Sequence, residues 1–258
     1  MNIVICQCPK ALGLEAARRA AERLREAARE KGRARMVVST GASQLDTFEA
    51  LLKQEVDWSR VELFHLDEYI NLPETHKASF RKYLKERFID RVNLGGVFLV
   101  NGTREGIAPL TKALREAPVD VGLIGIGENA HIAFNDPPAD FDTREAYHVV
   151  TLDDTCKNQQ VREGWFDAAG DVPDQAVSMT VYQIMQCKAV FSCVPYAVKA
   201  CAVGNMLRAK NIDPGVPASI LKTHADYTLL LDRDSSALVN EGEISALNGV
   251  KILLEKPL

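Results

Sequence analysis

Apolar residues along the chain fall into two alternating patterns. Short and nearly continuous apolar runs, the pattern of buried strands, occupy residues 2–6, 35–39, 61–66, 97–100, 119–127, 147–152, 188–194 and 226–232. The first run is followed by apolar residues at the period of an amphipathic helix, namely Leu14, Ala17, Ala21, Leu24 and Ala28. Such alternation is typical of a parallel sheet covered on both faces. It predicts an α/β fold with a doubly wound, mostly parallel sheet and helices on both faces.

Helical periodicity also follows several of the later runs. Its apolar positions are Phe80, Tyr83, Leu84 and Phe88 in one segment and Ile107, Leu110 and Leu114 in the next, and residues 199–210 have the same character. The sequence contains no internal repeat, no low-complexity segment and no linker rich in Pro, Gly and Ser. We therefore expect residues 1–258 to form a single domain.

Composition narrows the class of protein. Hydrophobic residues make up 47% of the 258 residues and charged residues 26%, a mixture typical of soluble globular proteins. A net charge of −4 gives no reason to expect nucleic acid or acidic lipid as a partner. The first residues lack the pattern of a signal peptide, and no apolar stretch approaches the ~18 residues of a membrane span. We expect a cytoplasmic protein without nucleic-acid or membrane partners, and homo-oligomer formation stays open.

The six cysteines do not form a recognisable metal site. Cys6 and Cys8 make a C-x-C pair without a second pair or a nearby histidine at zinc-ligand spacing. Most of the others lie in apolar runs, where a free cysteine is usually a small core residue. We expect buried thiols in a reducing compartment, with metal binding as the minor alternative, and we expect no cofactor.

Ligands of doubly wound sheets bind at the carboxyl ends of the strands, near the point where the strand order reverses. The first such strand end reads STGASQ, from Ser39 to Gln44. Its small residues let backbone N–H groups approach an anion, and Thr40 and Ser43 add hydroxyl donors. With Gly41 as its single glycine, the segment also fits an ordinary tight turn with a serine N-cap.

The second strand end carries two adjacent carboxylates, Asp67 and Glu68, within HLDEYINLP. Neighbouring side chains there point in different directions, so we expect only one of them to face the crevice. A carboxylate in a crevice can remove a proton from a carbon next to a carbonyl. The alternative is an acid that caps a helix or forms a salt bridge in a loop.

The third strand end is GIGENAHIAFNDPP, residues 125–138. Gly125 and Gly127 allow a sharp turn, and His131 can act as a proton shuttle whose ring is oriented by Asp136. The alternative is a structural histidine with satisfied hydrogen bonds. The two glycines are no dinucleotide signature, because the third glycine of that motif is absent.

The fourth strand end is VPYAVKA, with Lys199 at the start of a predicted helix. An isolated lysine is normally a solvated surface charge. At a strand-to-helix junction beside an anion-binding loop, it can instead hold a phosphate as a point charge. Taken together, an anion loop, a carboxylate base, an oriented histidine and a lysine would form the site of a sugar-phosphate isomerase.

These motifs resemble the glucosamine-6-phosphate deaminase/isomerase family in order and spacing. The similar strings are STGAS, FHLDEYINLP, THKASFRKYL, GIGENAHIAFNDPP and VPYAVKA, within residues 35 to 232. The resemblance implies a doubly wound α/β fold. It also implies conversion of an amino-sugar 6-phosphate and water into a ketose 6-phosphate, such as fructose 6-phosphate, and ammonia, without a metal.

The resemblance assigns roles to particular residues. Asp67 matches the base that moves a proton during enolisation, and His131 matches the residue that opens the sugar ring. Asp136 matches the acid that orients this histidine. The phosphate loop corresponds to Gly41, Ala42 and Ser43, beside Thr40, and its cationic partner to Lys199. The family's active-site arginine has no aligned match, and Arg162 lies nearest.

Three residues depart from the family pattern. Asn129 and Ala130 precede His131 where the family often has Asp-Gly, and Asp136 replaces a glutamate. We expect Asn129 to be a positioning group at the catalytic site. Its amide, in place of a carboxylate, leaves open which amino-sugar epimer the site prefers. Ala130 in place of glycine requires a negative φ.

Two alternatives stand beside the deaminase. A 6-phosphogluconolactonase shares the fold and a related glycine turn with histidine, but typically has DER and HTASLFP-like strings where this chain has DEY and HIAFNDP. A non-catalytic sugar-phosphate regulator would normally carry an N-terminal helix-turn-helix, whereas this chain begins with a strand pattern. A catalytically silent protein that binds a sugar phosphate is the remaining alternative.

Overall fold

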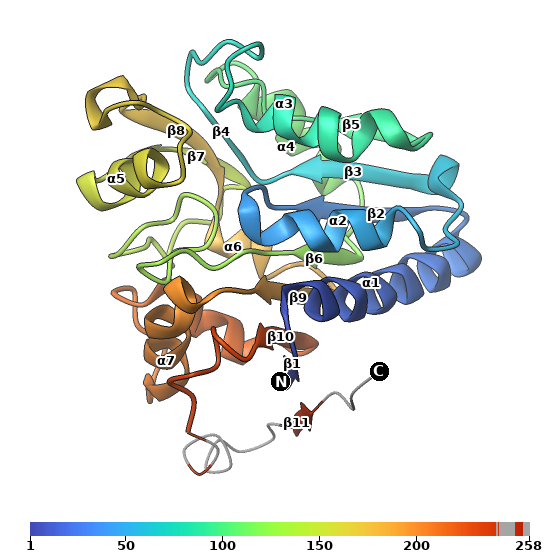
Figure 1. Ribbon diagram of the computed structural model, residues 1–258. Coiled ribbons are helices and arrows are strands. Elements are labelled where there is room, and N and C mark those ends of the chain that lie inside the picture. The colour runs from blue at the N-terminus through green and yellow to red at the C-terminus, as the bar shows by residue number, and fades with distance from the viewer. Residues whose placement is uncertain (241, 243–250, 255–258) are drawn as a thin grey trace.

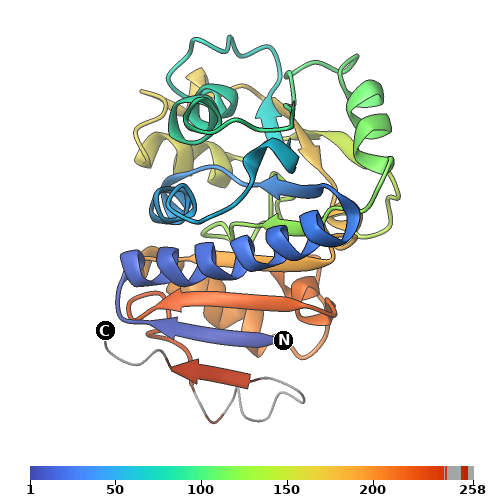
Figure 2. The same cartoon turned by 90° about the vertical axis from the view of Figure 1, so that its right-hand side faces the viewer.

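Eight parallel strands form the central sheet in the computed structural model of the chain, which describes residues 1–240, 242 and 251–254 (Figure 1). Their order is β11-β1-β10-β9-β6-β2-β3-β5. The strands are β1 (Asn2–Cys6), β2 (Ala34–Val38), β3 (Val61–His65), β5 (Gly96–Phe98), β6 (Val121–Leu123), β9 (Ala189–Val194), β10 (Tyr227–Asp232) and β11 (Lys251–Leu254). Figure 2 shows β11 beside β1 at one edge of the sheet.

Both faces of the sheet are buried. Successive residues of a strand point to opposite sides, so each strand contributes to two cores. Met36 and Val38 of β2 lie in one hydrophobic core, together with apolar residues of α1, α2 and α3. Val37 lies in the other core, together with residues of α4, α6 and α7. The helices are α1 (Pro9–Lys31), α2 (Leu45–Leu51), α3 (Phe80–Arg87), α4 (Ile107–Arg115), α5 (Asp154–Arg162), α6 (Val181–Ile184) and α7 (Ala200–Arg208). The predicted fold class is confirmed.

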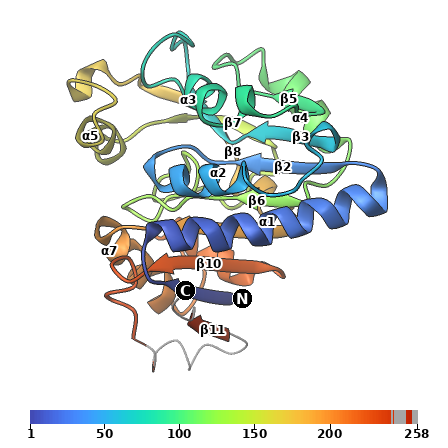
Figure 3. The same cartoon turned by 45° about the vertical axis from the view of Figure 1, so that its right-hand side comes forward.

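The strand order reverses in the middle of the sheet. From β2 the chain proceeds outward through β3 to β5, whereas from β6 it proceeds in the other direction through β9 to β10. In Figure 3 the arrowheads of β2, β3 and β10 point to the side on which α5 and α7 lie. The loops that follow β2, β6 and β9 therefore meet at this edge, next to the reversal.

A second sheet of three antiparallel strands lies next to that edge, in the order β4-β8-β7. Its strands are β4 (Asp67–Tyr69), β7 (Tyr147–Thr151) and β8 (Gln175–Met179). The run at 147–152 was expected beside the other strands, but it forms β7 of this separate sheet. A small core with Tyr69, Phe134, Phe166 and Cys156 packs beneath it, and Cys156 belongs to α5. This sheet thus carries α5 to the carboxyl ends of the parallel strands.

Helix α1 buries most of the face that its spacing predicts, including Ala17, Ala21 and Leu24, but not its first position. Leu14 is 39% exposed, whereas Leu12 is buried. The buried residues are Leu12, Gly13, Ala16, Ala17, Ala20, Ala21, Leu24 and Ala27. Alanines surround much of this helix, so more than one apolar stripe fits the sequence. The stripe that packs is the one whose small residues allow close approach, since a Cβ on Gly13 would lie 2.6 Å from the backbone carbon of Asp46.

Four of the six cysteines are buried, as expected for core thiols. They are Cys6, Cys156, Cys187 and Cys193, whereas Cys8 and Cys201 are exposed. Cys201 lies in an apolar run but on the outer side of α7, so the core interpretation is wrong for this residue. Among the helices in the described ranges, none combines the length and apolarity that crossing a membrane requires.

One fully buried charge ties the sheet to α4. Arg35 of β2 is 2% exposed, and its guanidinium lies 4.5 Å above the ring centroid of Phe64. The guanidinium donates hydrogen bonds to the carbonyl oxygens of Ala113, Leu114 and Ala117 at the end of α4. It also pairs with Glu62 at 2.8 Å. Arg35 therefore supplies hydrogen-bond donors to carbonyl groups at the end of α4, where a helix has few donors of its own.

Replacing Arg35 with methionine should lower the free energy of unfolding by about 3 kcal/mol, because it removes the buried donor of carbonyl groups at the end of α4 and the buried one of the two partners of Glu62. Arg33 offers a matched control, since it pairs with the same Glu62 at 3.0 Å but has a side chain that is 46% exposed. Arg33→Met should cost less than about 1 kcal/mol. Urea denaturation of both variants measures the difference. Equal losses would mean that burial of Arg35 contributes nothing specific.

Candidate active site

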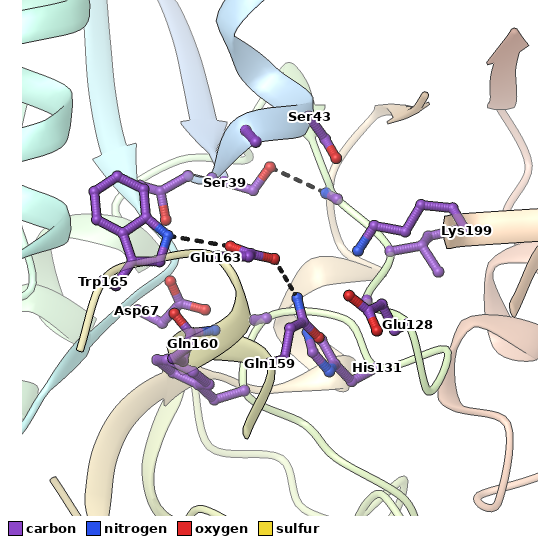
Figure 4. Close-up of a pocket in the computed structure, with 18 of the residues that line it drawn as sticks. Ser39, Ser43, Asp67, Glu128, His131, Gln159, Gln160, Glu163, Trp165 and Lys199 are labelled. Atoms are coloured by element: carbon purple, nitrogen blue, oxygen red, sulfur yellow. Dashed lines mark hydrogen bonds between the residues drawn. The ribbon is translucent and has the colours of Figure 1, made fainter. Parts of the chain in front are cut away.

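One cavity collects residues from the loops after β2, β6 and β9, from β4 and from α5 (Figure 4). The residues that line it are Ser39, Thr40, Gly41, Ala42, Ser43, Asp67, Phe80, Gly125, Ile126, Gly127, Glu128, His131, Ala133, Phe134, Gln159, Gln160, Glu163, Trp165, Tyr196, Val198 and Lys199. All four predicted strand ends thus contribute to the same cavity. Of the predicted site residues, Asn129 and Asp136 do not line it but lie behind His131.

The loop after β2 is held in place from two sides. Gly41 has φ 101 and ψ 173, a conformation that favours glycine. The hydroxyl of Tyr83 in α3 donates a 2.8 Å hydrogen bond to the carbonyl oxygen of Gly41. The N–H of Gly125 donates to Ser39 Oγ at 3.0 Å (Figure 4). This loop is therefore fixed relative to both α3 and the glycine turn after β6.

The two adjacent carboxylates have separate roles in the fold. Glu68 is fully buried and accepts hydrogen bonds from Ser79 Oγ at 2.8 Å and from the N–H and Nε of Arg81 at 3.0 Å each. It therefore caps the first turn of α3, the structural alternative considered for this motif. Asp67 is 6% exposed and lines the cavity. The expectation that only one of the pair faces the crevice is confirmed.

Asp67 has an unusual acidity. Burial, together with the negative charge of Glu68, raises the pKa of its carboxyl to about 8. A low-dielectric surrounding disfavours the charged form of an acid. Once ionised, such a carboxylate is a stronger base than an exposed one. Its pKa lies near neutral pH, where general bases work most effectively.

His131 forms a compact network with the two polar residues beside it. Its Nδ1 lies 3.0 Å from Oδ1 of Asp136. This distance allows an ion pair, although the two groups are not aligned as in a hydrogen bond. Asn129 donates from Nδ2 to the same Oδ1 at 3.1 Å and accepts the backbone N–H of His131 at 3.2 Å. Burial alone would raise the pKa of Asp136, but His131 and Asn129 lower it below the usual value. Asn129 thus links the histidine backbone to the carboxylate.

Ala130 does not have the negative φ that an alanine was expected to require. Its φ is 67, and the turn is closed by hydrogen bonds from the N–H of Ala130 to Gly127 O at 3.1 Å and from the N–H of Gly127 to His131 O at 2.9 Å. The left-handed conformation costs an alanine roughly 1 kcal/mol. Its methyl group is buried in the core, which returns roughly 0.8 kcal/mol. The expectation is wrong because burial of the side chain offsets the backbone cost.

Lys199 is buried rather than solvated. It is 6% exposed, ends the short 3₁₀ turn η5 (Ala197–Lys199) and points into the cavity (Figure 4). Burial lowers the pKa of its ammonium group, while Glu163 and Glu128 oppose this shift. The surface interpretation of this lysine is therefore wrong.

The contribution of α5 and its following turn was missed. Glu163 accepts hydrogen bonds from Gln159 Nε2 at 2.7 Å and from Trp165 Nε1 at 3.1 Å (Figure 4). Arg162, the nearest sequence match for the family's arginine, has a side chain 54% exposed and pairs with Glu128 at 2.8 Å instead of lining the cavity. No sequence signal marks these residues, because their approach depends on the separate antiparallel sheet.

Known proteins are similar to this chain over most of its length. Residues 7–230 match the family of glucosamine-6-phosphate isomerases/6-phosphogluconolactonase. A glucosamine-6-phosphate deaminase from Bacillus cytotoxicus is 30% identical over 245 residues, which cover 93% of this chain and 90% of that protein. A glucosamine-6-phosphate deaminase from Bacillus cereus is also 30% identical, with the same coverage.

Solved structures show the same fold. A monomeric glucosamine-6-phosphate deaminase matches with a TM-score of 0.84 and 28% identity, over 92% of this chain and all of that one. A 6-phosphogluconolactonase from Thermotoga maritima matches with a TM-score of 0.73 and 14% identity, over 90% of this chain and 99% of that one. The second likeness extends to the fold alone.

The raised pKa of Asp67 predicts a pH-dependent stability. The stabilisation that comes from its protonated form is complete below the unfolded pKa near 4 and is lost as pH rises through about 8. Asp67→Asn stays neutral, so its free energy of unfolding relative to the wild type should increase by roughly 1 kcal/mol per pH unit in this window. Urea denaturation at several pH values measures it, with the exposed Asp90→Asn as control. A difference that is constant with pH would contradict the raised pKa.

Proposed function

Because the chain belongs to the glucosamine-6-phosphate isomerase/6-phosphogluconolactonase family, we propose that it converts an amino-sugar 6-phosphate and water into the ketose 6-phosphate and ammonia. The observation that carries this proposal is the single cavity shared by Asp67, His131 and Lys199. Relatives at 30% identity are named glucosamine-6-phosphate deaminase. The reaction needs a base, a ring-opening group and a phosphate site, and each has a candidate residue here.

Ring opening is the first step that the site supports. His131 takes the proton of the anomeric hydroxyl and returns a proton to the ring oxygen, which gives the open-chain aldehyde. Asp136, 3.0 Å from Nδ1, stabilises the imidazolium that forms between these two transfers. Asn129 carries no charge and can only hold the pair in place, through its hydrogen bonds to both residues.

Proton transfer between carbons follows. Asp67 removes the proton from C2, and the negative charge passes to the aldehyde oxygen, which gives an enolate that carries the amino group. The same carboxyl delivers this proton to C1, and the nitrogen passes one of its protons to the oxygen, which leaves a hydroxyl group at C1 and a C=N group at C2. The C=N group left at C2 adds water, and ammonia then leaves to give the ketone. A pKa near 8 suits a group that must both accept and return a proton in one catalytic cycle.

The phosphate group has a candidate site at the other end of the cavity. Gly41, Ala42 and Ser43 line it beside Thr40, and the ammonium group of Lys199 points into it (Figure 4). Backbone N–H groups of a tight loop and a buried cation together favour a dianion. This end would hold the substrate while the reacting carbons lie toward Asp67 and His131.

A coupled assay tests the reaction. Glucosamine and galactosamine 6-phosphates should release ammonia and a ketose 6-phosphate in equal amounts. Asp67→Asn should lower kcat by roughly 10²–10⁴-fold, because the amide keeps the shape but cannot accept a proton. Exchange of the C2 proton with solvent should fall with it. Hydrolysis of 6-phosphogluconolactone by the folded protein, without ammonia release from either amino sugar, would replace the deaminase with the lactonase.

Asp136 and Asn129 should differ sharply in their contribution to catalysis. Asp136→Asn removes the charge that stabilises the imidazolium and should lower kcat/KM by roughly 10²-fold or more. Asn129→Ala removes only positioning hydrogen bonds and should cost about tenfold, and Asn129→Asp should be tolerated. The comparison is the rate on the cyclic substrate against enolisation of a ring-opened analogue. Equal slowing of both by Asp136→Asn would remove this residue from the ring-opening step.

A further inference from the structure

Tyr196 adopts a backbone conformation that normally requires glycine. Its φ is 80 and its ψ is 143, outside the small left-handed region open to other residues. It follows β9, lines the cavity and lies three positions before Lys199. Backbone outliers of this kind cluster at ligand sites, where the surrounding structure maintains them.

A buried carboxylate keeps Tyr196 in this conformation. Asp232, at the end of β10, is 1% exposed, and its Oδ2 accepts the N–H of Tyr196 at 3.0 Å. Its Oδ1 accepts the N–H of Ser235 at 2.7 Å, which fixes the carboxylate from the other side. The N–H of Lys199 donates to Tyr196 O at 3.0 Å. The outlier therefore starts the turn that carries Lys199.

The backbone alone does not explain the residue type. A glycine would adopt this conformation without strain and would form the same hydrogen bonds to Asp232 and Lys199. What tyrosine adds over glycine here is a side chain, in a residue that lines the cavity. Burial, together with Asp46 and Asp232, raises the pKa of its phenol, so the hydroxyl keeps its proton and can donate a hydrogen bond.

We propose that Tyr196 is a substrate-binding residue whose hydroxyl donates a hydrogen bond to the phosphate group held beside Lys199. The inference rests on the proposed function, because it deepens the phosphate end of the same site. In this proposal the strained turn presents a neutral hydrogen-bond donor, Tyr196, and a cation, Lys199, to one dianion. Binding is improved at the expense of stability, in a segment where glycine would serve the fold better.

The strain is tested by a matched pair of variants. Tyr196→Gly and Tyr196→Ala both remove the ring, and they differ only in how well the backbone tolerates φ 80. The glycine variant should melt about 1–3 °C above the alanine variant, although glycine is ordinarily the more destabilising residue. A glycine variant that melts at or below the alanine variant would show that the conformation is not strained, which overturns the argument.

Substrate affinity provides the second test. Tyr196→Phe keeps the ring and the strain but loses the hydroxyl, and it should raise KM for the sugar phosphate about tenfold with little change in kcat, the factor for one lost hydrogen bond to a charged group. Tyr196→Gly should raise KM at least as much. Asn71, which has φ 59 but does not line the cavity, gives the control, because Asn71→Gly should leave KM unchanged. A KM within twofold of the wild type in Tyr196→Phe overturns the proposal.

Inorganic phosphate separates this proposal from the proposed function. Phosphate should raise the melting temperature of the wild type, and should raise it less in Tyr196→Phe. If the wild type shows neither turnover nor a shift with phosphate, the proposed function fails and this inference fails with it. If the wild type responds and Tyr196→Phe responds equally, only the inference about Tyr196 is overturned.

Discussion

The site depends on the pairing of β6 with its two parallel neighbours. This three-residue strand pairs Leu123 with Val38 of β2 on one side and with Phe191 of β9 on the other. The pairing continues past the strands, through the N–H of Ser39 to Leu123 O at 2.9 Å and the N–H of Ile124 to Phe191 O at 3.0 Å. Three loops that are distant in the sequence are thereby brought to one point. The reversal of strand order would produce no cavity without this short central strand.

The pKa values of two aspartates in this site are shifted in opposite directions by their surroundings. Asp67 is buried beside another carboxylate, so its pKa is raised. Asp136 is partly buried, and the pKa of its carboxyl is lowered by the histidine and the amide that contact it. One acid is therefore suited to exchanging protons and the other to remaining charged. The difference comes from burial and a neighbouring carboxylate at Asp67, and from the histidine and the amide at Asp136.

The sequence was sufficient for the fold class and for the residues at the strand ends, because both follow from local patterns. Apolar runs identified the parallel strands, and polar residues after them met where the strands end. The local pattern could not decide between Asp67 and Glu68, since this depends on how β4 is oriented against β8, and only the family resemblance selected Asp67. Glu163 and Trp165 were missed for the same kind of reason, because the antiparallel sheet brings them to the cavity. The expected negative φ of Ala130 was wrong, because a local steric rule takes no account of the burial of its methyl group.

Helix α3 forms hydrogen bonds at both ends of the cavity. Its first turn is bound to Glu68, the neighbour of Asp67, and its Tyr83 is bound to Gly41 of the loop after β2. The neighbour of the carboxylate and the anion loop are therefore both attached to one helix. In the proposed reaction, the separation between the carboxylate and this loop sets how many carbon atoms fit between a phosphate group and the carbon that loses its proton. The helix would thus make the length of the substrate, and not only its hydroxyl groups, a property that the cavity recognises.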